Sequence, residues 1–266
     1  MKKFWGFLLV IVLMTSCGEY QSLLKSNDYN LVYKKAIEYY NKGDYQRAMN
    51  LLDGVRSVFV GQAKAQNIAY YRAFCSYNMK DYQIASDLFK QFIQTYPESS
   101  FAEECLYMMG FCDYKASPKP RLDQQVTEKA IREFQLYLSR YPYSMRKDKV
   151  NTYMDEMRDK LSYKAYLSAK NYYLREHYKA AVISLQNCLK DYPGSKYREE
   201  IMYMLFVSKY QMALNSVEDK KVERYNNARE EYYYFADEYP HSRYAADVKK
   251  MYEDIEAYLE NYKFED

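Results

Sequence analysis

The chain has 266 residues, and its 39 Lys and Arg residues nearly balance its 36 Asp and Glu residues, for a formal net charge of +3 at pH 7. This balance excludes the strongly basic surface that nucleic-acid-binding proteins present. Hydrophobic residues make up 48% of the sequence and 35 residues are tyrosine. The chain is therefore long and apolar enough to form a packed array in which most tyrosines are structural.

The N-terminus has the features of a bacterial lipoprotein signal. Two lysines precede an apolar run of about eleven residues that ends at Met14, and a run of that length is too short to span a bilayer. The run continues into LMTSC, which resembles the lipobox in which Cys17 is lipidated and becomes the first residue of the mature protein. We expect residues 1–16 to be the signal peptide and residues 17–28 to be a lipidated, partly flexible tether. An ordinary cleaved signal is the alternative.

This resemblance also implies where the protein resides. Several acyl chains on Cys17 would give stable anchoring in a membrane, and we expect no cofactor apart from this covalent lipid. Gly18 follows the cysteine, in place of the Asp that commonly retains lipoproteins at an inner membrane. We therefore expect an outer-membrane lipoprotein whose folded part lies on the periplasmic face.

After the tether, the sequence predicts five copies of a two-helix unit. The first helix of each copy carries two tyrosines seven residues apart, and the leading tyrosines are Tyr33, Tyr70, Tyr107, Tyr166 and Tyr203. The intervals between them are 37, 37, 59 and 37 residues, and a fixed period of this size is typical of repeat arrays. In the second helix an alanine is followed, four and seven positions later, by apolar or aromatic residues on the same face. These alanines are Ala48, Ala85, Ala130, Ala181 and Ala228.

Short turns and breaks separate the predicted helices. The turn inside a copy reads GDY, KDY or EHY, and the last four copies end in YPES, YPYS, YPGS and YPHS. Pro cannot continue a helix, and the Ser two residues later can cap the next one. Ser100 and Glu103 also fit a capping box. Gly110, in the middle of a first helix, is expected to let that helix approach the small alanine of the second helix closely.

Two departures from the period predict how the copies are grouped. Copies 3 and 5 carry insertions between their helices, KASPKPRLDQQV and NSVEDKKVER, and an extra charged stretch, Met145–Ser162, separates copies 3 and 4. We interpret this stretch as an elongated helix that joins repeats 1–3 in residues 29–144 to repeats 4 and 5 in residues 145–266. Arg243–Phe264 is expected to form a closing helix, because an uncovered end repeat would expose its apolar face.

The pattern resembles the tetratricopeptide repeat, which has a small residue in its first helix, Gly-Asp-Tyr at the turn, Ala and Phe in its second helix and Pro at its end. The expected fold is therefore all-α: an α-solenoid of five tetratricopeptide-like hairpins with a C-terminal capping helix. In this repeat type the first helices line a concave side, and residues seven apart on a helix face nearly the same way.

The tyrosine pairs are the candidate binding residues. We expect the first Tyr of each pair to line a groove and the second to pack partly between repeats; the alternative is that all of them are interior packing residues. Tyr suits the recognition of extended peptides because it is rigid and amphipathic. The expected peptide-binding residues are Tyr33, Tyr70, Phe74, Tyr77, Tyr107 and Phe111, and the expected partner-docking residues are Tyr166 and Tyr203.

No catalytic or metal-binding constellation is predicted. His177 and His241 have no companions at ligand spacing, and no phosphate-binding loop or hydrolase motif occurs. Acidic residues alternate with Lys and Arg, as on solvated helix faces. We therefore expect a protein that is not an enzyme, with Cys75, Cys105, Cys112 and Cys188 present as buried free thiols.

The opening CGEYQSLLKSNDYN, which runs into KKAIEYYNKGDYQRA, together with the lipid anchor and five repeats, resembles the BamD family of outer-membrane assembly lipoproteins, in particular its Bacteroidetes-type members. The resemblance implies a non-catalytic scaffold of the β-barrel assembly machinery. Its C-terminal repeats would bind the periplasmic domains of the barrel-forming subunit, and its N-terminal repeats would receive unfolded barrel precursors. Two alternatives stay open: a coordinator of peptidoglycan synthesis and outer-membrane constriction, and a glycan-binding lipoprotein of nutrient uptake.

Overall fold

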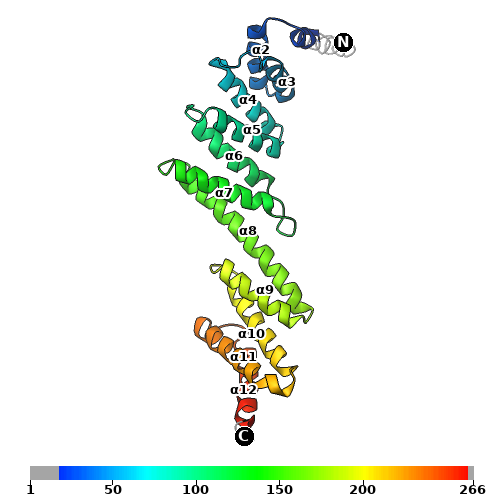
Figure 1. Cartoon of the computed structure of the whole chain (residues 1–266), viewed down its shortest axis with the longest axis vertical. Helices are drawn as coiled ribbons and strands as arrows, with labels where there is room; N and C mark the ends of the chain where they lie inside the picture. The colour runs from blue at the N-terminus through cyan, green and yellow to red at the C-terminus, as the bar shows by residue number, and fades with distance from the viewer. Residues whose placement is uncertain (1–17, 263–266) are drawn as a thin grey trace, which may run out of the picture. The chain divides into compact units, whose positions relative to one another are not determined.

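The structure, a computed structural model, describes residues 18–262, and helices are the only regular secondary structure in that part of the chain (Figure 1). The chain divides into two compact units. One comprises the chain up to Pro118 together with Asp123–Met157, and the other comprises Lys119–Leu122 and the chain from Arg158 onward. Each unit is built from helical hairpins around hydrophobic clusters of its own. The predicted all-α solenoid fold is confirmed.

The first unit contains three hairpins in which each helix packs against the next along the chain. Their helices are α2 (Tyr29–Asn41), α3 (Tyr45–Val55), α4 (Lys64–Asn78), α5 (Tyr82–Thr95), α6 (Ala102–Ala116) and α7 (Gln125–Arg140). Every second helix buries the alanine and the residues four and seven positions after it, as predicted. These residues are Ala48, Leu52, Val55, Ala85, Phe89, Phe92, Ala130, Phe134 and Tyr137.

The helix α8 begins in the first unit and ends in the second. It runs without interruption over Lys147–Leu174, so the elongated helix predicted for Met145–Ser162 is confirmed and continues directly into the fourth copy. The remaining helices are α9 (Tyr178–Asp191), α10 (Arg198–Leu214), α11 (Glu218–Glu238) and α12 (Ala245–Tyr262). The insertion NSVEDKKVER falls mostly within α11, which it lengthens.

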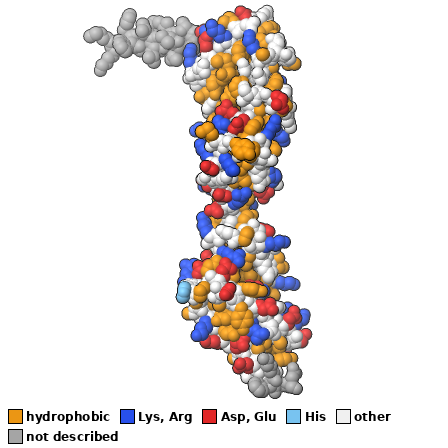
Figure 2. Space-filling view, turned by 90° about the vertical axis from the view of Figure 1, so that its left-hand side faces the viewer, with side chains coloured by type: hydrophobic (Ala, Val, Ile, Leu, Met, Phe, Trp, Pro, Cys, Tyr) orange, Lys and Arg blue, Asp and Glu red, His pale blue; other side chains and the backbone are white. Residues whose placement is uncertain are grey.

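The closing helix α12 lies within the predicted range and covers the last hairpin. Its Val248, Ile255 and Leu259 are buried in one cluster with Phe206 and Phe235 of the fifth copy, so it supplies the apolar cover that an end repeat needs. None of the described helices combines the length and hydropathy needed to cross a bilayer. Figure 2 shows basic, acidic and hydrophobic side chains interspersed over the face in view, in keeping with the near-neutral charge.

The N-terminal segment differs from the expected tether. Residues 18–24 are helical, and Tyr20 and Leu23 are buried in the cluster of the first hairpin. Tyr20 accepts a hydrogen bond from Asn50 at 3.0 Å, and Glu19 pairs with Lys35 at 3.0 Å. The expectation of flexibility is therefore corrected for these residues, because their apolar face covers the open end of the array. The signal peptide and Cys17 lie outside the described residues, and the division at residue 144 stays a prediction.

The turns inside copies 1, 2 and 4 share one backbone conformation. Gly43, Lys80 and Glu176 adopt positive φ angles of 81°, 68° and 59°. The next residue, Asp81, donates a backbone hydrogen bond to the carbonyl of Ser76 at 3.0 Å. This bond ends helix α4 in the manner of a Schellman motif. Lys80 and Glu176 therefore occupy a conformation that glycine adopts more easily.

Contrary to the prediction, the serines of the breaks do not cap the following helices, because the N-cap residues Phe101 of α6 and Tyr197 of α10 have no side-chain cap. Each serine instead caps the turn before the helix, where its Oγ accepts a hydrogen bond from the backbone N–H two residues later. These serines are Ser99, Ser144, Ser195 and Ser242. The capping box predicted for Ser100 and Glu103 is wrong, because no side chain caps Phe101 at the start of α6. Glu103 instead accepts hydrogen bonds from Tyr137 at 2.9 Å and from Ser144 at 2.7 Å.

Gly110 permits a close approach between α6 and α7, as predicted, but its nearest neighbour is not the alanine. A Cβ atom at this position would lie 2.9 Å from Cδ1 and 3.0 Å from Cε1 of Phe134. The glycine therefore makes room for an aromatic ring four residues after Ala130, which is why a small residue is needed at that point of α6.

Candidate functional site

Side chains of α4, α6 and α8 form a continuous series of aromatic contacts in the first unit. Tyr70 and Phe74 have ring centroids 4.5 Å apart, and Phe74 reaches Phe111 through Tyr77. Phe111 stacks on Tyr107 at 5.7 Å with an interplanar angle of 11°. We call the whole series the aromatic band, which comprises Tyr70, Phe74, Tyr77, Tyr107, Phe111, Tyr114 and Tyr153.

The structure brings five of the six predicted peptide-binding residues into this band and places the sixth apart. Tyr70, Phe74, Tyr77 and Phe111 are half-buried, whereas Tyr107 is only 7% exposed and packs against Phe134 and Tyr137. Four of the five therefore combine a fixed orientation with an accessible ring surface.

Tyr33 lies away from the band. Its ring packs near Phe59, at 6.1 Å between centroids, and Lys64 Nζ lies 5.7 Å from its centroid. The first tyrosines of the copies are thus not equivalent, because the loop after α3 and the first residue of α4 supply the partners of Tyr33.

Two residues of the aromatic band were not among the predicted binding residues. Tyr114 is the second tyrosine of its copy, which we expected to pack between repeats, and Tyr153 lies in the extra stretch where no repeat motif occurs. Their rings lie 4.5 Å apart and stack at 27°. The available signal for Tyr153 was its spacing from the buried Val150 and Met157, which places all three on one helix face.

Hydroxyl groups in the band are held by acidic side chains. Tyr70 donates to Glu104 Oε2 at 2.8 Å, and Tyr114 donates to Glu156. Burial, followed by the neighbouring Glu156, raises the pKa of Tyr114 to about 12, and burial with Glu104 raises the pKa of Tyr70 further. The tyrosines therefore remain neutral hydrogen-bond donors at physiological pH.

Cationic side chains border the band. Arg146 Cζ lies 5.0 Å from the ring centroid of Tyr107, Lys115 Nζ lies 5.9 Å from that of Phe111, and Lys149 Nζ lies 5.9 Å from that of Tyr153. Cations at these distances are attracted to aromatic faces, and they add polar groups to the edge of an apolar surface. The arrangement suits a polypeptide that presents both apolar side chains and backbone carbonyls.

The two predicted docking residues of the second unit have largely structural partners. Tyr166 is 5% exposed, and its ring stacks on Tyr197 at 4.4 Å. Its hydroxyl accepts a hydrogen bond from Lys170, which also pairs with Glu200.

Tyr203 has more free surface than Tyr166. Its ring is half-buried and stacks on Tyr244 at 4.0 Å, with an interplanar angle of 11°. Tyr203 therefore joins α10 to the start of α12 and still offers part of its surface to solvent.

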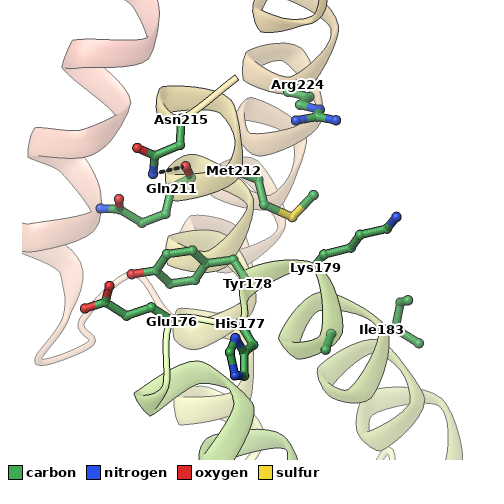
Figure 3. A pocket seen from close by; sticks show the side chains of 10 residues that line it. Glu176, His177, Tyr178, Lys179, Ile183, Gln211, Met212, Asn215 and Arg224 are labelled. Atoms are coloured by element: carbon green, nitrogen blue, oxygen red, sulfur yellow. Dashed lines mark hydrogen bonds between the residues drawn. The ribbon is translucent and has the colours of Figure 1, made fainter. Parts of the chain in front are cut away.

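A cavity of about 690 Å³ opens in the second unit where the turn before α9 faces the end of α10 (Figure 3). In that view the ring of Tyr178 lies across the cavity, and Met212 extends toward the side of Lys179 and Arg224. Arg224 donates to Ser216 Oγ at 2.5 Å. The sequence predicted the EHY turn but not this hollow, because the other walls come from α10 and α11, much later in the chain.

A model of the outer membrane lipoprotein family YfiO matches the sequence over residues 25–200 and again over residues 164–265. The two matches together cover most of the chain. The chain belongs to the YfiO family. The proteins of this family are outer membrane lipoproteins.

Two of the solved structures that are similar to this YfiO-family chain are TPR proteins. A TPR repeats protein from Bacteroides fragilis is 13% identical with a TM-score of 0.42, and the alignment covers 87% of this chain and 99% of that one. The TPR2AB domain of yeast Sti1, in its complex with pHSP90, is 14% identical with a TM-score of 0.39, over 86% and 98% of the two chains. No curated protein matches the sequence.

The four cysteines within the described residues of this YfiO-family chain are structural. Cys75, Cys105, Cys112 and Cys188 are all buried and free. Burial raises the pKa of Cys75 and of Cys105 to about 12, so these thiols stay protonated and are poor nucleophiles. Within residues 18–262, no cluster of three or more His, Cys, Asp or Glu side chains is placed to hold a metal ion.

Proposed function

We propose that this YfiO-family lipoprotein is a scaffold of the outer-membrane β-barrel assembly machinery, of the BamD type and with the opening sequence of Bacteroidetes-type members. Lipid on Cys17 would anchor it at the periplasmic face of the outer membrane. The family match supports the association with the outer membrane. The helical repeats support a scaffold role, and the resemblance of the N-terminal sequence supports the specific machinery.

The aromatic band supports a role in holding unfolded barrel precursors. An extended peptide gains affinity from rigid aromatic surfaces that lose little side-chain entropy on binding. Four half-buried rings, Tyr70, Phe74, Tyr77 and Phe111, stay in place through contacts with one another. They form a preorganised apolar surface, which reduces the cost of ordering on binding.

The second unit would bind the periplasmic domains of the barrel-forming subunit. Tyr203 provides a partly exposed ring for that contact, and the cavity beside Tyr178 and Met212 offers a mixed apolar and charged surface. Tyr166 is nearly covered, so its contribution is to hold α8 and Tyr197 in position rather than to touch the partner.

Substitution in the band tests the precursor-binding role. We expect Tyr77→Ala and Phe111→Ala each to weaken binding of a fluorescent unfolded barrel-precursor segment about 10-fold, equivalent to about 1.4 kcal/mol, measured by anisotropy. Tyr143→Ala is the control, because Tyr143 is 98% exposed and lies outside the band. Thermal melts confirm that each variant is folded. Unchanged binding by both folded band variants contradicts the proposal.

Cell fractionation tests the anchor and the machinery. We expect Cys17→Ala to move the protein out of the membrane fraction, and mass spectrometry of the mature wild-type N-terminus to find acyl chains on Cys17. The wild-type protein should also retain a large outer-membrane barrel protein with periplasmic domains in pull-downs from detergent-solubilised envelopes. Reproducible absence of such a protein from those pull-downs overturns the proposed machinery, and an unmodified Cys17 thiol overturns the anchor.

A further inference from the structure

A hollow of about 410 Å³ in the first unit is lined by α4, by α5 and by the loop that follows α3. Its apolar walls are formed by Ala65, Ala69, Leu88 and Phe92. None of its lining residues belongs to the aromatic band. Pockets that enclose ligands begin at about 300 Å³, so this hollow is large enough to hold a group from another molecule.

One arginine in the wall of this hollow is mostly buried and has unused hydrogen-bond donors. The Arg72 side chain is 12% exposed, and its Nε atom donates to Asp53 Oδ1 at 2.6 Å. Its Nη1 and Nη2 atoms make no hydrogen bond within residues 18–262, and neither atom is fully buried. Every nitrogen of a guanidinium group carries N–H donors. Because Arg72 lines the hollow, the donors of Nη1 and Nη2 are available to a group that enters it.

The charged side chains at the hollow favour an anion with a single charge. Arg56 is an exposed lining residue, and no acidic side chain is among the described residues that line the hollow. Asp53 lies outside the lining but neutralises one of the two arginines through its ion pair with Arg72. Arg56, Arg72 and Asp53 therefore leave one net positive charge, which a monoanion would balance.

We propose that this hollow binds the carboxylate of an acidic side chain in a partner polypeptide, together with an apolar side chain next to it. The carboxylate would accept hydrogen bonds from both free nitrogens of Arg72, in the paired geometry that guanidinium and carboxylate groups share. The apolar side chain would cover Leu88 and Phe92. Val60, an apolar lining residue that is 74% exposed, would add to that contact.

Isothermal titration calorimetry with the full-length protein and short capped peptides tests this site. Ac-GSLELSG-NH2 carries one acidic side chain between two leucines, and Ac-GSLQLSG-NH2 carries the uncharged isostere. We expect the glutamate peptide to bind at least about 10-fold more tightly than the glutamine peptide, because only a carboxylate pairs with the guanidinium. Ac-GSAEASG-NH2 should bind at least about fivefold more weakly than the glutamate peptide, because it lacks the apolar side chains that cover the walls.

Matched variants locate the binding. Gln91→Glu adds a negative charge to the lining and should weaken binding of the glutamate peptide at least about 10-fold. Gln94→Glu is the control, because Gln94 is exposed on the same helix but does not line this hollow. Arg72→Lys should reduce the preference for glutamate over glutamine, since lysine keeps the charge but lacks the paired donors. Thermal melts confirm that each variant is folded.

Five outcomes would overturn the proposal. Three are equal binding of the glutamate and glutamine peptides, wild-type binding by folded Gln91→Glu, and no binding of the glutamate peptide up to about 1 mM. A fourth is tighter binding of a peptide with phosphoserine in place of the glutamate, which would assign the hollow to phosphate. The fifth is loss of binding in Phe111→Ala with unchanged binding in Gln91→Glu, which would move the peptide to the aromatic band.

Discussion

Single residues in the turns are held in a conformation that their side chains disfavour. Lys80 is exposed and has a φ of 68°, and a left-handed conformation costs a non-glycine residue about 1 kcal/mol. We expect Lys80→Gly to raise the free energy of unfolding by about 0.5–1 kcal/mol, after allowance for the greater freedom of glycine in the unfolded chain. Urea denaturation measures this change.

The matched control for Lys80 is Lys90→Gly. Lys90 is an exposed residue in the interior of α5, so the same replacement there should lower stability by about 1 kcal/mol through helix propensity alone. Opposite signs at the two positions identify backbone strain as the cause. A lower unfolding midpoint for Lys80→Gly contradicts this account.

Gly110 shows a conflict between local preference and packing at one residue. Alanine would favour the helix by about 1 kcal/mol, but its Cβ would lie 2.9 Å from the Phe134 ring. We expect Gly110→Ala to lower the free energy of unfolding by about 1–3 kcal/mol, because overpacking outweighs helix propensity. Thermal melts measure this loss in the wild-type protein and in a protein that carries Phe134→Leu. The loss caused by Gly110→Ala should be smaller in the Phe134→Leu protein. An equal loss in the two proteins would assign the effect to another contact.

At the scale of elements, the contact of α7 with α5 and α6 contains a buried acidic pair. Burial, with Asp113 beside it, raises the pKa of Glu133 from an ordinary value of 4.5 to about 8. Lys129 and Lys90 act in the opposite direction. The folded chain therefore holds this proton more tightly than the unfolded chain does. Its contribution to stability is complete below about pH 4.5 and is lost as the pH rises toward about 8.

Glu133→Gln tests this dependence because glutamine does not titrate. We expect the stability of the variant, relative to wild type, to be greater at pH 8.5 than at pH 5, in urea denaturation at both pH values. Glu128→Gln is the control, because Glu128 is exposed on the same helix. A relative stability that stays the same at both pH values would show that Glu133 ionises normally in the folded chain.

The helix of residues 18–24 is an element that covers the first repeat. Leu23 is 5% exposed, so Leu23→Ala should lower the free energy of unfolding by about 2–3 kcal/mol. Amide hydrogen exchange should show the loss of protection first in α2 and α3, which this helix covers. Gln21→Ala on the exposed side of the same helix is the control. Equal effects of the two substitutions contradict a covering role.

At the scale of the whole molecule, the two units have separate hydrophobic clusters. In repeat proteins, stability is a sum of repeat and nearest-neighbour terms. We expect Phe89→Ala, which costs about 3–5 kcal/mol, to reduce hydrogen-exchange protection in α4–α7 and to leave α10–α12 nearly unchanged. Leu185→Ala should have the reciprocal effect on the second unit. Uniform loss of protection along the chain in both variants contradicts independent units.

Much of the candidate site was predictable, but its details were not. Spacing placed Tyr70, Phe74, Tyr77 and Phe111 on first helices, and the structure brings them into one band. Spacing alone did not distinguish Tyr107, which occupies the same motif position as Tyr70 yet is nearly buried. The difference arises from Phe134 and Tyr137 of the following helix, which the local pattern does not describe.

Local sequence patterns were sufficient to predict the five hairpins, the elongated helix α8 and the closing helix, because helical periodicity, turn residues and proline breaks act over a few residues each. The packing of the complete chain was needed to establish that residues 18–24 cover the first repeat, that Phe134 occupies the space at Gly110 and that Glu133 is buried beside Asp113. These features depend on which side chains meet after the helices pack. Burial and pairing are set by neighbours that are distant in the sequence, and no local pattern contains that information.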